Sequence, residues 1–171
     1  MNQQPARKSM VVKSLVGMLV LVVVGGGAFW SLNCPCERIP GGYLLGDEVT
    51  EVVSDWEFAN QVPLCQLEVQ VGFLPHSINL NCMATETGDL YLSCSRCEGK
   101  RWSSAVGVMT EARLKLDNLV YPVTVTRIKD PDELERAWRS RLSKLRQLRG
   151  NSVDISAVRP EHWWTFRLES S

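Results

Sequence analysis

The chain has 171 residues, and its 19 lysines and arginines balance 19 aspartates and glutamates, so the formal net charge is zero. This balance gives no reason to expect nucleic acid as a partner. Hydrophobic residues make up 44% of the chain, which is enough for a core and too much for a disordered tail. Because His76 and His162 are the only histidines, a catalytic triad or a histidine metal cluster has little support, and no metal site is predicted.

The first segment with a clear physical character is an apolar run near the amino terminus. Residues 10–32 contain one charged side chain, Lys13, and about 17–25 apolar residues suffice to cross a bilayer. They are therefore predicted to form a transmembrane anchor, with Lys13 snorkelling to the lipid headgroups. The alternative is a signal peptide cleaved near Ala28, but the run is longer than a usual signal core and bulky Phe29 and Trp30 follow directly.

The charges that flank this run predict its orientation. Arg7, Lys8 and Lys13 precede the uncharged part, whereas Arg38 is the only basic residue in the next twenty. The positive-inside bias predicts a cytoplasmic amino terminus and a periplasmic or other extracytoplasmic domain. The predicted order is a cytoplasmic terminus, a single-pass anchor, a connector and one domain, at residues 1–9, 10–32, 33–50 and 51–171.

Alternating side chains predict strands in the domain. Leu67, Val69, Val71 and Phe73 are separated by polar residues, which is typical of a half-buried strand. Further strands are predicted at residues 78–82, 90–93, 112–116, 119–128 and 163–168. Five or six antiparallel strands followed by one late helix predict a mainly β fold class, a small barrel closed against that helix.

The late helix has start and stop signals. Asp130 can cap it, Pro131 suits its first position and Gly150 ends it. An apolar stripe is predicted to face the core, at Leu134, Trp138, Leu142, Leu145 and Leu148. The opposite face is expected to be solvated, with contact to anionic lipid headgroups as the alternative, and carries Arg136, Arg139, Arg141, Lys144, Arg146 and Arg149.

The order of motifs in the domain resembles a known family. The strand at residues 90–93 leads through a polar turn to Gly99-Lys100-Arg101-Trp102, then to two hairpin strands and an Arg127–Pro131 exit into the helix. This order resembles the FMN-binding split β-barrel superfamily of pyridoxamine-phosphate-oxidase-like and deazaflavin-reductase-like proteins. The resemblance covers roughly residues 50–168 and implies a membrane-anchored, FMN-dependent oxidoreductase acting on a small substrate.

The resemblance also implies which residues bind the cofactor. In the family, hydroxyl groups at a strand end and a following cation hold the flavin phosphate, and these roles fall on Ser93, Ser95, Lys100 and Arg101. Asn79 would lie beside the flavin ring. The family's flavin usually lies between two subunits, which implies a homodimer. The alternative function is a cofactor-free barrel that serves as an interaction or assembly module in an envelope or respiratory membrane complex.

Six cysteines leave several interpretations open. Cys94 and Cys97 form a CxxC motif. One interpretation is a structural disulfide, and the other is a thiol–disulfide redox pair in which Arg96 lowers the pKa of the thiol. Cys34 and Cys36 form a second close pair, which either forms a disulfide or completes a zinc site with the first pair. An exported domain favours disulfides.

Two further expectations concern buried positions. Cys65 and Cys82 lie in or beside neighbouring predicted strands, and the simplest interpretation is that they are buried thiols, although six cysteines leave fifteen possible connectivities. Aromatic residues are more often core than cofactor slot in a small barrel, and this applies to Trp56, Phe58, Trp102, Trp163 and Trp164.

Overall fold

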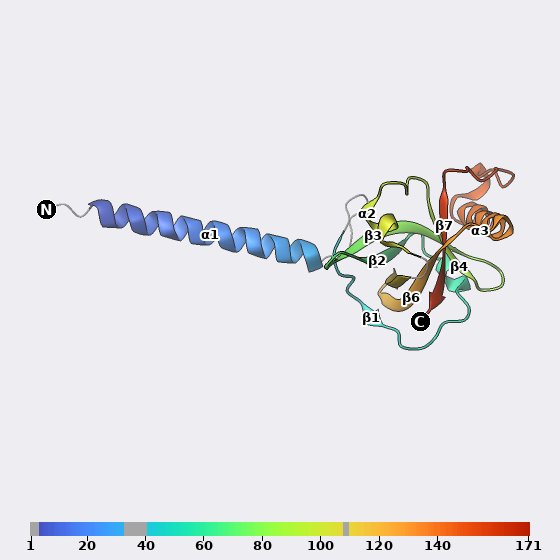
Figure 1. Ribbon diagram of the computed structural model, residues 1–171, viewed down its shortest axis with the longest axis horizontal. Helices are drawn as coiled ribbons and strands as arrows, with labels where there is room; N and C mark the ends of the chain where they lie inside the picture. The colour runs from blue at the N-terminus through green and yellow to red at the C-terminus, as the bar shows by residue number, and fades with distance from the viewer. Residues whose placement is uncertain (1–3, 33–40, 108–109) are drawn as a thin grey trace.

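The computed structural model describes residues 4–32, 41–107 and 110–171, and it shows a long helix followed by a barrel (Figure 1). The helix, α1, spans Gln4–Leu32. All side chains from Val12 to Phe29 are exposed. This stretch is long and apolar enough to cross a membrane, as the sequence predicted.

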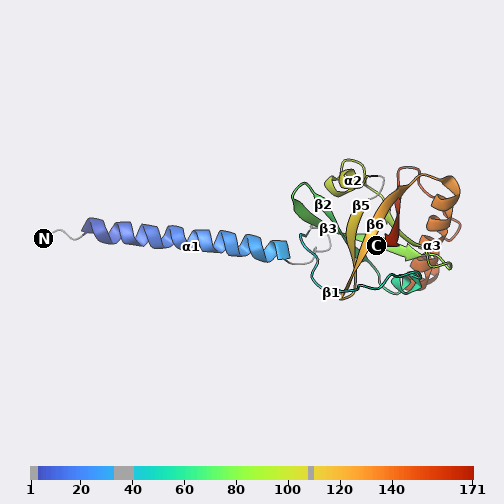
Figure 2. The ribbon, with the colours of Figure 1, turned by 60° about the horizontal axis from the view of Figure 1, so that its bottom comes forward.

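The barrel is closed by six antiparallel strands in the order β6, β5, β2, β3, β4, β7, with β7 pairing back to β6 (Figure 2). The strands are β2 (Cys65–Val71), β3 (Leu74–Ala84), β4 (Leu90–Cys94), β5 (Thr110–Leu116), β6 (Leu119–Ile128) and β7 (Trp164–Ser170). The predicted fold class, a mainly β antiparallel barrel with one late helix, is therefore confirmed.

The barrel interior is filled by apolar side chains. The alternation of apolar and polar residues predicted that these side chains share one face of each strand. Leu67, Val69 and Leu114 are almost fully buried, and Phe166 closes the same cluster from β7. The prediction that Phe73 belongs to this set is wrong. Gly72 has φ +64° in the turn after β2, so the strand period is broken there and the Phe73 side chain is fully exposed.

Residues 41–48 form a strap, which crosses the outer face of the barrel from β3 to β6. It begins where Gly41 exchanges two backbone hydrogen bonds with Ser77. It ends as β1 (Asp47–Glu48), which pairs in parallel with β6. A side chain at Gly46 would bring a Cβ within 2.4 Å of the Asn118 carbonyl oxygen, so only glycine fits this crossing.

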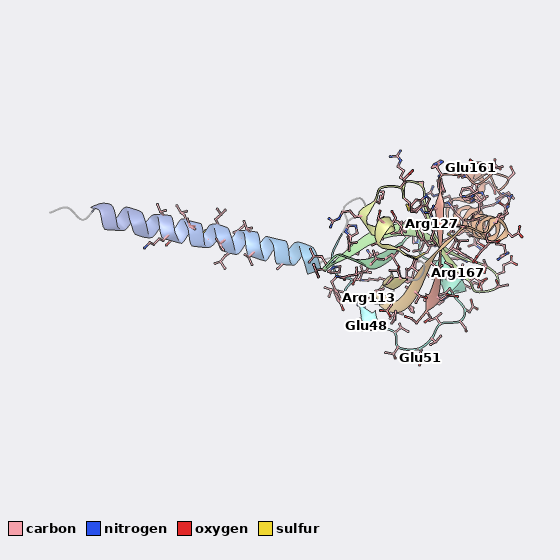
Figure 3. All side chains as sticks on the ribbon, viewed as in Figure 1. Glu48, Glu51, Arg113, Arg127, Glu161 and Arg167 are labelled. Atoms are coloured by element: carbon pink, nitrogen blue, oxygen red, sulfur yellow. A yellow bond between two sulfur atoms is a disulfide. The ribbon has the colours of Figure 1, made fainter. Side chains whose placement is uncertain are left out.

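A buried ion pair fastens the strap. Glu68 projects outward from β2, is 7% exposed, and accepts a hydrogen bond from the Leu44 amide. Arg113 on β5 donates to Glu68 at 2.9 Å, to the Leu44 carbonyl at 3.0 Å and to Glu48 at 2.7 Å. Arg113 and Glu48 lie together at the edge of the barrel (Figure 3). The sequence predicts only a connector at residues 33–50, so this ion pair is a new feature of the structure.

Helix α3 spans Pro131–Arg149 with the predicted signals. The Asp130 carboxylate accepts from the Glu133 amide at 2.9 Å, and Gly150 ends the helix at φ +71°. Trp138 and Leu142 are buried as expected. Three short helical segments and the strand β1 were not predicted; the segments are η1 (Glu57–Asn60), α2 (Arg101–Ala105) and η2 (Gly150–Ser152).

The prediction that the basic face of α3 is solvated is wrong at two positions. Lys144 is 4% exposed, and its ammonium donates to the carbonyls of Ala59 at 2.8 Å and Cys82 at 2.6 Å. Arg141 is half-buried. By contrast, Leu148 of the predicted stripe is 42% exposed. The helix is therefore rotated so that these cations reach acceptors on β3 and β4.

Candidate functional site

A hollow of about 300 Å³ lies where β3, β4 and the loop after β4 meet α3. Its lining combines amides, hydroxyls, cations and one tryptophan, from Asn79, Leu80, Asn81, Ser93, Cys94, Ser95, Arg96, Lys100, Arg141 and Trp163. These lining residues include three cations and no carboxylate. The hollow is therefore suited to an anion.

Strand pairing and a closed loop bring the β4 residues to the hollow. Ser93 pairs with Asn81 of β3 one residue before the end of β4. The following loop is closed by the Cys94–Cys97 disulfide and by a hydrogen bond from the Lys100 amide to the Cys97 carbonyl at 3.2 Å. This closure returns the Lys100 side chain to the rim of the hollow, beside the strand end.

Arg141 enters the hollow from α3 and is held on two sides. One Nη1–H donates to the Ser93 hydroxyl at 3.0 Å. The guanidinium lies 4.8 Å from the centre of the Trp163 ring and 5.9 Å from that of Trp138. Its Nε–H is buried and has no hydrogen-bond partner among the described residues. Arg141 thus retains a fixed donor that is not used by the fold.

Burial lowers the pKa of Arg141, but the side chain keeps its proton at neutral pH. Desolvation, with a smaller contribution from the charge of Arg149, lowers the pKa of Arg141 to about 10. The guanidinium therefore remains charged at pH 7. A charged donor in a partly desolvated position attracts an anion more strongly than one in water.

Four of the five predicted cofactor residues meet in the hollow, and they are Asn79, Ser93, Ser95 and Lys100. Arg101 instead begins α2. Burial, and secondly the positive charge of Arg101, lower the pKa of His76 on β3. The charge of Arg101 thus acts on the start of β3, and Arg101 is not among the residues that line the hollow.

Arg141 and Trp163 are among the members of the hollow that sequence reasoning did not assign to it. Arg141 was treated as part of a solvated helix face, and Trp163 as packing. The signal that could have found Arg141 is its spacing from Trp138: residues three apart share a helix face, so Arg141 borders the predicted core stripe.

The described cysteines form two disulfides. Cys94 and Cys97 are bonded, which agrees with one of the alternatives for the CxxC. The expectation of free buried thiols at Cys65 and Cys82 is wrong, because β2 and β3 pair so that their Cα atoms lie 5.8 Å apart, and the two sulfurs are bonded. Cys34 and Cys36 lie outside the described residues. Within the described ranges no group of three or more acidic, histidine or cysteine side chains could hold a metal ion.

The other tryptophans and Phe58 have mainly structural positions. Trp56 and Trp102 are 3% exposed members of the core. Phe58 contacts Trp56 at a ring-centre distance of 5.7 Å, and Trp164 packs against the core with Phe166. The expectation that aromatic residues belong to the core holds for Trp56, Trp102 and the partly buried Trp164. It is wrong for Phe58, which is 37% exposed, and Trp163 lines the hollow.

The fold and the hollow together define a small closed β-barrel with a recess of anion-binding chemistry. No protein-family model matches this chain, and no curated protein matches it. Among solved structures, the FAD binding protein from Mycobacterium smegmatis is similar at 14% identity and a TM-score of 0.42, over 68% of this chain and 87% of that one. A conserved hypothetical protein from Mycobacterium tuberculosis is similar at 12% identity and a TM-score of 0.47, over 72% and 85%.

Proposed function

We propose that the barrel binds flavin mononucleotide by its phosphate in the hollow between β4 and α3. The observation that carries this proposal is the buried Nε–H of Arg141, which has no acceptor among the described residues. Leaving a buried charged donor unpaired costs on the order of 1–3 kcal/mol or more. Because Arg141 lines the hollow, a phosphate oxygen bound there would supply the missing acceptor once the guanidinium turns its Nε–H toward it.

The other residues of the hollow fit the same group. Ser93 and Ser95 offer hydroxyl donors, and Lys100 adds an exposed cation at the rim. Arg141 presents a planar donor set, which suits bidentate contact with a phosphate. Hydroxyls together with two cations match the charge and the acceptor-rich surface of a phosphate dianion.

The size of the hollow supports a second subunit in the complete site. Its volume of about 300 Å³ lies at the lower end of the range of about 300–1,000 Å³ that is typical of small-molecule sites. One barrel would therefore enclose the phosphate end of the ligand and leave the ring to be covered by a two-fold partner. The homodimer remains a prediction, which light scattering of the full chain with and without FMN would test.

We propose an oxidoreductase role on this basis, toward a small substrate that is not yet identified. A bound flavin supplies hydride-transfer chemistry. The contribution of this chain is to fix the phosphate through Ser93, Lys100 and Arg141 and to keep the surroundings of the ligand positively charged. A positive environment favours the anionic form of a reduced cofactor.

The proposed location is a membrane, with α1 as the anchor, the amino terminus in the cytoplasm and the barrel on the extracytoplasmic side. The exposed apolar surface of α1 and the basic residues Arg7, Lys8 and Lys13 support this arrangement. The Cys65–Cys82 and Cys94–Cys97 disulfides are in keeping with an oxidising compartment.

A flavin titration of the full chain in mild detergent tests the cofactor proposal. Wild-type protein should take up added FMN with a change in flavin absorption and fluorescence. Lys100→Gln should weaken binding roughly tenfold, since it removes one charge-assisted contact. Lys129→Gln, which changes an exposed lysine beyond β6, is the matched control and should bind like wild type. A protein that binds neither FMN nor inorganic phosphate would overturn the proposal and favour the cofactor-free interaction module.

A second candidate function, thiol–disulfide exchange, is favoured by one observation. The Cys94–Cys97 disulfide borders the hollow, and Arg96 between the two cysteines supplies a cation that would stabilise a thiolate. Equilibration with glutathione buffers, followed by alkylation and mass spectrometry, distinguishes the roles. A pair that stays oxidised in reducing buffers is structural, whereas reversible reduction near the potential of the buffer supports exchange.

A further inference from the structure

The turn between β2 and β3 presents two large apolar side chains to solvent. Phe73 has a relative exposure of 101%, and Leu74 is 69% exposed. Val71 pairs with Leu74, so Gly72 and Phe73 form the tip of a tight hairpin, and the φ of +64° at Gly72 fixes its shape. The conformation of the turn therefore exposes Phe73. The exposure of this apolar tip to water is energetically unfavourable.

The chain path limits how far this hairpin can lie from the end of α1. Helix α1 ends at Leu32, and Gly41 exchanges backbone hydrogen bonds of 2.9 and 3.1 Å with Ser77. The nine peptide steps between them span at most about 32 Å when fully extended. Ser77 lies four residues from Phe73, which is about 13 Å along β3. In both ribbon views the hairpin end of β2 and β3 faces α1 (Figures 1 and 2).

We propose that Phe73 and Leu74 insert into the interfacial layer of the bilayer that holds α1, so that the hairpin is a second contact between the barrel and the membrane. This inference rests on the proposed anchoring of α1. A bilayer is the favoured occupant because the tether holds it at high effective concentration beside the tip. Two side chains are also too small a patch for a stable protein interface, which needs about 800 Å² per partner.

The chemistry of the tip suits the membrane interface. Aromatic side chains are enriched at the level of the headgroups, and a leucine beside one adds apolar area that leaves water. Docking also fixes the orientation of the barrel. Asn79 lies on β3, six residues beyond Phe73, so this residue of the hollow is held at most about 20 Å from the inserted tip.

The test uses the full chain reconstituted in nanodiscs that contain brominated phosphatidylcholine, which quenches tryptophan on contact with the acyl region. Phe73→Trp adds a reporter at the tip, and its signal is the difference from wild-type protein. Val158→Trp is the matched control: Val158 is 83% exposed and lies between α3 and β7, close in sequence to Glu161, which Figure 3 places on the side away from α1.

The brominated lipid should reduce the added fluorescence of Phe73→Trp roughly twofold and leave that of Val158→Trp unchanged. Equal fluorescence with brominated and ordinary lipid at both positions, in protein that stays with the nanodisc, would overturn the docking and leave the anchor intact. Protein that does not co-purify with nanodiscs and is released from membranes by carbonate would overturn the anchor, and the docking with it. A Phe73→Ser variant that still shows wild-type hydrogen exchange protection at the hairpin in nanodiscs would also count against insertion.

Discussion

Charged side chains that are shielded from water are fully hydrogen-bonded on one side of the barrel and only partly hydrogen-bonded on the other. Under the strap, Glu68 and Arg113 satisfy each other, the Leu44 backbone and Glu48. Beside α3, Arg141 reaches Ser93 with one nitrogen and leaves its buried Nε–H without a partner among the described residues. Complete pairing indicates a structural role, because each desolvated group is compensated inside the fold. Incomplete pairing at Arg141 is what the proposed phosphate site requires, because a bound ligand would then supply the remaining partner.

The strap side should lose the most stability when its pairing is broken. Arg113→Met leaves Glu68 buried without its counter-charge, and we expect the free energy of unfolding to fall by about 3–5 kcal/mol. Chemical denaturation of the full chain in mild detergent measures this. Glu111→Gln, at an exposed position on the same strand, is the control and should change stability by less than about 0.5 kcal/mol.

A double variant sharpens this test of the strap. Glu68→Gln combined with Arg113→Met removes both charges, so no charged group is left unpaired. Its stability should lie above that of Arg113→Met alone, because the uncompensated carboxylate is gone. If Arg113→Met and Glu111→Gln were equally stable, the ion pair would contribute nothing and the comparison between the two sides would lose its basis.

The buried ammonium of Lys144 should make the stability of the protein depend on pH. Burial, with a smaller effect of the Arg141 charge, lowers the pKa of Lys144 from 10.5 to about 8. The folded protein therefore binds this proton less tightly than the unfolded chain, and the unfolded chain carries more protons between these two values. Stability should accordingly rise with pH from about 8 to 10.5, by no more than about 3 kcal/mol.

Denaturation midpoints should be measured at several pH values for wild type and Lys144→Met. The difference between the two proteins isolates the contribution of Lys144 to stability. The variant has no ammonium at this position and should lack the rise. Tyr91, whose pKa is raised to about 12 mainly by burial, opposes the trend above pH 10 equally in both proteins. Identical pH profiles would mean that the carbonyls of Ala59 and Cys82 offset the desolvation of Lys144 completely.

On the hollow side, Arg141→Met should separate binding from stability. The loss of charged hydrogen bonds worth about 1.5–3 kcal/mol weakens FMN binding roughly 10- to 100-fold. Stability should change by less than about 1 kcal/mol, because the substitution also removes an unpaired buried donor. Arg146→Met, on an exposed part of the same helix, should leave both quantities unchanged. A large loss of stability with unchanged FMN affinity would assign Arg141 to the fold alone.

The contrast also explains what the sequence could predict. Strand periodicity and the Asp130 and Gly150 signals are local, so β2 to β7 and α3 were predicted close to their observed bounds. Ser93, Ser95 and Lys100 lie within one strand end and its loop, so their meeting was also predictable. Arg141 lies 48 residues from Ser93. Its position depends on how α3 packs, which side-chain period alone does not determine.

The strap and Phe73 also show that side-chain periodicity does not predict tertiary packing. The outward-facing Glu68 follows the alternation rule, but its burial depends on a segment that crosses it from another part of the chain. Phe73 obeys the alternation and yet lies in the turn, because β2 ends at Val71 and Gly72 has a positive φ. Periodicity identifies which face a side chain occupies within a strand, but not what covers that face.

The smallest expected effect concerns the disulfide that closes the loop at the hollow. In the double variant Cys94→Ser/Cys97→Ser the loop keeps the hydrogen bonds that the Lys100 amide and the Ser103 hydroxyl donate to the Cys97 carbonyl. A crosslink across so few residues restrains the unfolded chain by only about 2 kcal/mol. Because those hydrogen bonds still hold Lys100 near Ser93, FMN affinity should fall by less than about tenfold. Titration of the double variant beside Cys65→Ser/Cys82→Ser separates a local effect on the loop from a general loss of stability. The Cys65–Cys82 disulfide lies in the core, and neither cysteine lines the hollow. A complete loss of FMN binding confined to the first variant would show that the disulfide, and not the cations, organises the hollow.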